Sequence, residues 1–175
     1  MNNVLAAALT LAALTACGAP PVTDPVPDLP IHWVQGIGIA VEPGTPKWAD
    51  DDLATIDAFR TGVEYAGFSL KDVQGWIIVI NNAAEVKCGN TTDTSSLIRG
   101  CAHDSEWVEV ATAGADNIYQ TALIHEAVHA ALMNTEYHGD KCHKLPIWRD
   151  FRSVLGAVPA DSEPRLAYWW MSESC

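Results

Sequence analysis

The spacing of hydrophobic positions between residues 31 and 133 predicts strands and helices of one α+β domain. Apolar runs and apolar-polar alternation predict strands over residues 31–41, 75–80 and 107–112. Residues 75–80 are apolar throughout, which predicts a central strand covered on both faces. Residues 107–112 alternate, which predicts an edge strand. We therefore expect a small mixed sheet packed against helices.

Helical spacing of apolar side chains predicts the helices. Residues 48–66 form one helix, with the aspartates at 50–52 as its N-terminal cap. Its inward side chains are expected to be Leu53, Ile56, Phe59 and Val63. A second helix runs from Asn117, which forms a capping box with Gln120, to about Met133. Residues 88–104 are polar and predict a loop, and further C-terminal helices are expected over residues 144–155 and 162–171.

The N-terminal thirty residues have a different composition from the rest. Residues 1–16 form an apolar run that is too short to span a membrane but suits a cleaved export signal. Leu14-Thr-Ala-Cys17 resembles the bacterial lipoprotein signal, which implies a lipid on Cys17, although residues 1–3 lack the usual Lys or Arg. An ordinary secretory signal is the alternative. Residues 17–30 contain five prolines and predict a spacer, so the folded domain is expected over residues 31–175.

Composition and charge restrict the partners. The chain has 175 residues, of which 49% are hydrophobic, and this suits one domain with its own core. Its formal net charge is −12, which argues against binding to nucleic acid or to anionic lipid. We expect a monomer in the bacterial cell envelope, periplasmic or on the outer surface, which contacts the membrane only through the lipid on Cys17.

The remaining four cysteines are expected to form disulfides, because an exported chain meets an oxidising compartment. Three pairings of these four residues are possible. We favour Cys88 with Cys101, which closes a polar loop, and Cys142 with Cys175, which ties the C-terminus to the middle of the chain.

The sequence His125-Glu-Ala-Val-His129 is the strongest indication of chemistry. Two imidazoles four residues apart on a helix project from one face and can reach a single ion, with the carboxylate of Glu126 beside them. A catalytic zinc needs three protein ligands and one open position. The loop after the helix offers His138, Asp140 and His143 as the third ligand. We prefer His143, because a ligand next to a cysteine and at the start of a helix is held more rigidly than one at a loop tip.

These residues, together with Gly139-Asp-Lys-Cys-His143 and Trp148, resemble the zincin metallopeptidases, and the late third histidine is similar to the SprT-like group. The resemblance covers about residues 117–155. It implies a zincin-like fold, Zn²⁺ held by His125, His129 and His143, and hydrolysis of peptide or protein substrates by a zinc-bound water with Glu126 as the proton carrier. The DNA-linked biology of SprT-like proteins is not carried over to an exported chain.

Several supporting roles stay open at this point. The resemblance implies that the expected edge strand 107–112 pairs with an extended substrate, and the alternative is a plain sheet edge. Tyr137, His138 or Tyr168 would stabilise the oxyanion, and Asp140 or Asp150 would orient a ligand histidine. His32 and His103 are expected at the surface. The alternatives to an enzyme are an inactive zincin-shaped binding module of the envelope, or a chance occurrence of the motif in a structural domain.

Overall fold

The protein is described here by a computed structural model over residues 25–46, 51–86, 88, 99–113, 118–140 and 143–151. Several features predicted from the sequence lie outside these residues: the signal segment 1–16, the lipid site at Cys17, the capping residue Asn117, the Cys142–Cys175 pair, and the helix at 162–171 with Tyr168. The described part of the chain forms a mixed α+β fold, as predicted.

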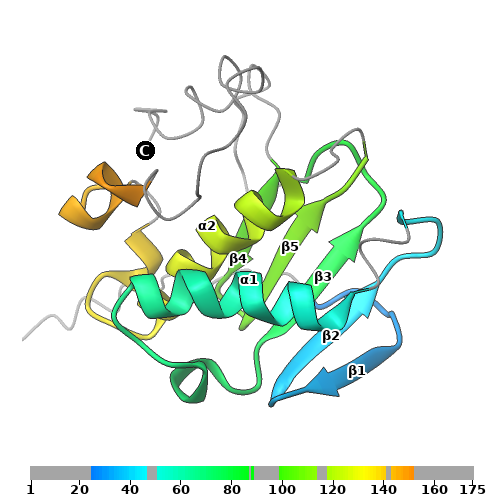
Figure 1. The fold of residues 1–175 in the computed structure, drawn as a ribbon, viewed down its shortest axis with the longest axis horizontal. Coiled ribbons are helices and arrows are strands. Elements are labelled where there is room, and N and C mark those ends of the chain that lie inside the picture. The colour runs from blue at the N-terminus through cyan, green and yellow to red at the C-terminus, as the bar shows by residue number, and fades with distance from the viewer. Residues whose placement is uncertain are drawn as a thin grey trace, which may run out of the picture.

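A five-stranded mixed sheet forms the centre of the fold, in the order β1-β2-β3-β5-β4 (Figure 1). The β2–β3 and β3–β5 pairs are parallel, and the outer pairs, β1–β2 and β4–β5, are antiparallel. The strands are β1 (Ile31–Val34), β2 (Ile37–Val41), β3 (Ile77–Asn81), β4 (Gly100–His103) and β5 (Trp107–Ala111).

The predicted strand 31–41 is two strands joined by a tight turn. Gln35 and Gly36 both have positive φ, at 53° and 84°. Positive φ at both central residues is typical of the two-residue turns that match the twist of an antiparallel hairpin. The chain therefore reverses at Gln35, and β1 pairs with β2.

The central position of β3 is confirmed, but the prediction of an edge strand at 107–112 is wrong. β3 lies between β2 and β5, and Ile78, Val79 and Ile80 are buried. β5 is covered on its outer side by β4, which pairs with it antiparallel. β4 falls in the segment that the sequence predicts to be a polar loop, and it is the edge strand next to β5 among the described residues.

Both α-helices pack on the same side of the sheet (Figure 1). α1 (Asp52–Tyr65) begins at Asp51, whose carboxylate accepts a hydrogen bond from the Ala54 backbone N–H at 3.1 Å. The expected inward side chains are fully buried at Ile56, Phe59 and Val63, but Leu53 is 65% exposed and its prediction is wrong.

The second α-helix, α2 (Ile118–Met133), carries the His-Glu-Ala-Val-His motif and packs on α1, β4 and β5. Leu123, Ala127 and Ala130 are buried in the same core as Ile78 and Val108 of the sheet. The helix end agrees with the prediction. In the described part of the chain, no helix is both long enough and apolar enough to cross a membrane.

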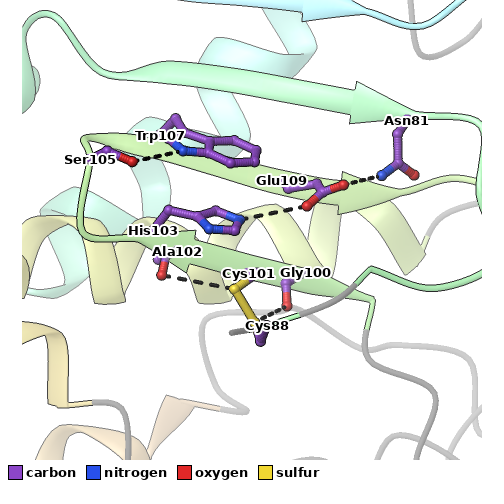
Figure 2. A network of polar contacts seen from close by, with 9 residues as sticks. All are labelled: Asn81, Cys88, Gly100, Cys101, Ala102, His103, Ser105, Trp107 and Glu109. Carbon is purple, nitrogen blue, oxygen red and sulfur yellow. Dashed lines mark hydrogen bonds and ion pairs between the residues drawn. A yellow bond between two sulfur atoms is a disulfide. The ribbon is translucent and has the colours of Figure 1, made fainter. Parts of the chain in front are cut away.

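The opposite face of the sheet is also partly covered. Val26 and Leu29, from the end of the predicted spacer, pack beside Trp107. On this face His103 of β4 stacks on Trp107, with ring centroids 3.6 Å apart, and its Nε2 lies 3.6 Å from a carboxylate oxygen of Glu109 (Figure 2). His103 is 7% exposed, so its predicted surface position is wrong, whereas His32 is exposed as expected.

The predicted disulfide between Cys88 and Cys101 is confirmed, with an S–S distance of 2.06 Å. Cys101 is the second residue of β4, so the bridge attaches this strand to residue 88 (Figure 2). The described part of the predicted helix 144–155 differs from the prediction: it contains a short 3-10 helix, η4 (Pro146–Arg149), with Pro146 in its first turn.

Candidate metal centre

The two histidines of α2 meet as the motif predicts. His125 and His129 lie one helical turn apart, and their Nε2 atoms are 2.9 Å from each other. Both side chains are almost completely buried, with 9% and 7% of their surface exposed. Two imidazole nitrogens therefore point at one place below the surface.

His143 completes this pair, as preferred from the sequence. Its Nε2 lies 3.1 Å from that of His125 and 3.0 Å from that of His129. The return of the chain requires a tight loop, in which His138, Gly139, Asp140 and His143 all have positive φ. His138 is exposed and is not part of the cluster, which consists of His125, His129 and His143.

The donor chemistry of the cluster fits a metal ion. His129 Nδ1 lies 2.6 Å from the backbone oxygen of Gly139, and a carbonyl oxygen can only accept a hydrogen bond. The proton of His129 is therefore on Nδ1, and the lone pair of Nε2 points toward the other two imidazoles. A backbone carbonyl on the second nitrogen is the usual arrangement behind a metal-binding histidine.

The protonation of the other two histidines agrees with this assignment. Burial lowers the pKa of His125 well below 6.5, and the neighbouring His129 and His143 lower it further. Burial also lowers the pKa of His143, against the opposing effect of the Asp140 carboxylate. Neutral imidazoles are the form that binds metal. The three residues are thus able to hold a metal ion.

Asp140 holds the loop that carries His143. Its carboxylate accepts hydrogen bonds from the backbone N–H of Lys144 at 3.0 Å and of Leu145 at 2.8 Å, and from the Trp148 indole at 2.7 Å. Burial acts to raise the pKa of Asp140, but these three hydrogen bonds outweigh it and lower the pKa. Asp140 is therefore a carboxylate that shapes the loop, and it is not one of the three clustered residues.

Trp148 packs against all three histidines. Its ring centroid lies 4.9 Å from that of His125, 4.6 Å from that of His129 and 4.5 Å from that of His143. Because the Asp140 carboxylate holds the indole N–H, the ring has a fixed orientation over the imidazoles. In the sequence Trp148 contributes only to the resemblance to zincins, and no contact with the histidines is predicted for it.

Glu126 lies on the side of α2 that faces β4. Its side chain is 6% exposed, and burial raises its pKa to about 8, while a hydrogen bond from the Ala102 backbone N–H acts in the opposite direction. A cation nearby would favour the charged carboxylate and lower this pKa. The group is thus able to exchange a proton near neutral pH.

Among the described residues, Tyr137 and Asp150 are not brought to the cluster, although the sequence predicts supporting roles for them. Tyr137 is 46% exposed, and its hydroxyl is hydrogen-bonded to Glu136. Asp150 is exposed, and Tyr168 lies outside the described residues. Neither Tyr137 nor His138 therefore lies where an oxyanion stabiliser beside the cluster is expected.

No protein-family model matches the chain, and searches of curated proteins and of solved structures returned no match.

Proposed function

We propose that the protein is a zinc-dependent metallopeptidase of the zincin type, in which His125, His129 and His143 hold Zn²⁺ and Glu126 is the general base. The main support is the convergence of three imidazole Nε2 atoms within 2.9–3.1 Å of one another. The motif on α2, the lowered pKa values of His125 and His143 and the buried carboxylate of Glu126 agree with this function.

The chain's own residues have separate tasks in this reaction. Bound zinc would supply Lewis acidity toward water and toward the peptide carbonyl. In the proposed reaction the Glu126 carboxylate takes a proton from the attacking water and gives it to the leaving amine. Gly139 orients His129 through its carbonyl, and Asp140 holds the loop of His143 in place.

We place the peptide substrate along β4, because an extended chain can add to the edge of a sheet by backbone hydrogen bonds. This strand replaces residues 107–112 in the role expected from the sequence. β4 is at the sheet edge among the described strands and passes directly beside Glu126.

The proposal is tested by measuring zinc and peptidase activity in Glu126→Gln. The substitution removes the proton carrier but keeps the size of the side chain. We expect one zinc per chain, as in the wild type, and a loss in kcat of about 10² to 10⁴-fold on a peptide library. Atomic absorption and quenched-fluorescence peptides provide the two measurements.

Two further variants make the metal assignment specific. His143→Ala is expected to lose zinc, whereas His138→Ala, at the exposed histidine of the same loop, is expected to keep it. A wild-type protein without stoichiometric zinc would end the proposal. Zinc binding with no turnover in the wild type, and an unchanged biological effect of Glu126→Gln, would instead support a zincin-shaped binding module.

We also propose that the protein is exported and held at the cell envelope by a lipid on Cys17. The Cys88–Cys101 disulfide supports export, because such bonds persist in oxidising compartments. Metabolic labelling with a fatty acid is expected to mark the wild type and to leave Cys17→Ser unlabelled. Labelling of both proteins to the same extent would contradict the lipid site.

A further inference from the structure

β4 contacts the candidate general base directly, at a position where it has no side chain. A Cβ atom added at Gly100 would lie 2.7 Å from Cγ and 2.9 Å from Oε1 of Glu126. Real Cβ atoms do not approach other atoms this closely, so a side chain at position 100 would force the Glu126 carboxylate to move. Gly100 does not have positive φ, so its lack of a side chain is needed for space and not for backbone conformation.

The same strand supplies a hydrogen bond to this carboxylate. The Ala102 backbone N–H donates to Glu126. Gly100 and Ala102 are alternate residues of β4, and alternate residues of a strand share one face. Gly100 therefore leaves room for the Glu126 side chain on the strand face next to α2, and the Ala102 backbone gives the carboxylate a donor.

The other face of β4 is attached to its surroundings by two kinds of contact. Cys101, between Gly100 and Ala102, is bridged to Cys88. His103 stacks on Trp107 and lies beside Glu109, whose carboxylate also accepts a hydrogen bond from Asn81 (Figure 2). These contacts tie β4 to β5 and residue 88, and through Glu109 to β3, on the face away from α2.

From these contacts we propose that β4 is the positioning element of Glu126: Gly100 leaves the space that the carboxylate occupies, and the Cys88–Cys101 disulfide holds the strand at that distance. Gly100 and the two cysteines act through Glu126 and are positioning residues. The inference adds to the proposed function and depends on it for its effect on catalysis. The contact itself can be tested without any activity.

The first experiment is a double-mutant cycle on thermal unfolding with Gly100→Ala and Glu126→Ala. Gly100→Ala is expected to lower Tm in the wild type, because the new methyl group meets Cγ and Oε1 of Glu126. In Glu126→Ala these atoms are absent, so we expect the decrease in Tm to be less than half as large.

Gly38→Ala is the matched control for this cycle. Gly38 is another buried strand glycine, and its added Cβ would meet Ile31 at 2.9 Å and not Glu126. Its effect on Tm should be the same in both backgrounds. If Gly100→Ala fails to fold, the double variant should still fold. Equal loss of Tm, or equal failure to fold, in both backgrounds would overturn the proposal.

The second experiment separates positioning from metal binding. We expect Gly100→Ala to keep one zinc per chain and to lose on the order of 10²-fold in kcat with little change in KM, as for a misplaced catalytic group. The double variant Cys88→Ser/Cys101→Ser should also keep zinc, and its Tm should fall less on adding Gly100→Ala, because the released strand can move away. An undiminished fall would overturn the role of the disulfide.

The two proposals fail in different ways. A protein without zinc or peptidase activity would contradict the proposed function and leave the unfolding cycle intact. A cycle without coupling, in a protein that binds zinc and cleaves peptides, would contradict only the role of β4.

Discussion

Asp140 illustrates how a residue outside the cluster determines where a candidate ligand lies. It has positive φ, at 44°, which few residue types other than glycine adopt readily. Asn and Asp tolerate this conformation better than most, and the carboxylate of Asp140 also binds three donors within the following eight residues. The Asp140 carboxylate thus holds the loop that carries His143, and it also holds the indole of Trp148.

We predict that Asp140→Asn weakens zinc binding about 10 to 100-fold, the usual effect of removing a group that orients metal ligands. Asparagine keeps the conformational tolerance and the size, but one oxygen becomes an NH₂ group that faces the N–H donors. Competition with a fluorescent chelator measures the affinity. Asp150→Asn, at an exposed aspartate of the same segment, is the control and should bind zinc like the wild type. Equal affinities of the two variants would show that Asp140 does not position the ligand.

The local part of the site could be predicted from the sequence, because His125 and His129 are neighbours on any helix that contains them. His143 could be preferred as the third candidate from its place next to a cysteine at the start of an expected helix and from the resemblance, but the sequence left His138 and Asp140 open. The role of Trp148 could not be predicted, because its contacts with three histidines depend on the path of the loop. Its spacing matches an ordinary core position.

Among the helices and strands, the close crossing of α1 and α2 determines the position of the motif. A Cβ atom added at Gly62 of α1 would lie 2.2 Å from the Ile124 backbone oxygen and 2.7 Å from Ala127 Cβ. Ile124 and Ala127 flank the first histidine and Glu126 in the sequence of α2. The small residues at this crossing thus bring the backbone of α1 against the part of α2 that carries the motif.

We predict that Gly62→Ala lowers the free energy of unfolding by about 1–3 kcal/mol, because the added methyl group overpacks the contact between α1 and α2. In an exposed helix the same substitution would stabilise by about 1 kcal/mol, so the sign of the change is itself diagnostic. Urea unfolding followed by circular dichroism measures the free energy. Glu64→Ala, two residues along on the exposed side of α1, is the control and should change the stability little. A stabilised Gly62→Ala would contradict the close crossing.

The elements with long apolar patterns were predictable, since β3 and α2 carry their signal within a single segment. β4 was not predictable, because Gly-Cys-Ala-His contains none of the strand-favouring residues Val, Ile, Thr, Phe, Tyr and Trp, and it pairs with β5 only through the fold. This omission also explains the wrong edge assignment of β5. Its alternation does not reflect a solvent-exposed edge, since Glu109 contacts Asn81 and His103 on the far face of the sheet.

At the scale of the whole described chain, the candidate centre brings together side chains from two segments. α2 supplies two histidines, and residues 143–151 supply the third together with Trp148. α1 contacts the same segment, because the Tyr65 hydroxyl donates to the Ile147 backbone oxygen at 2.6 Å and the Tyr65 ring packs on Phe151. An ion bound by the three imidazoles would therefore connect residues 143–151 to α2, which packs on α1.

This arrangement predicts that zinc stabilises the folded protein. An ion that binds the native state and not the unfolded chain adds about 2.7 kcal/mol at a free concentration of 100 times Kd. We therefore expect a chelator to lower Tm and added zinc to restore it, in differential scanning calorimetry. His143→Ala removes the donor from outside α2, so its Tm should no longer respond to zinc, while that of the exposed-site control His138→Ala should. A chelator that leaves the wild-type Tm unchanged would mean that the three histidines hold the segment without an ion, since only a bound ion makes stability depend on its concentration.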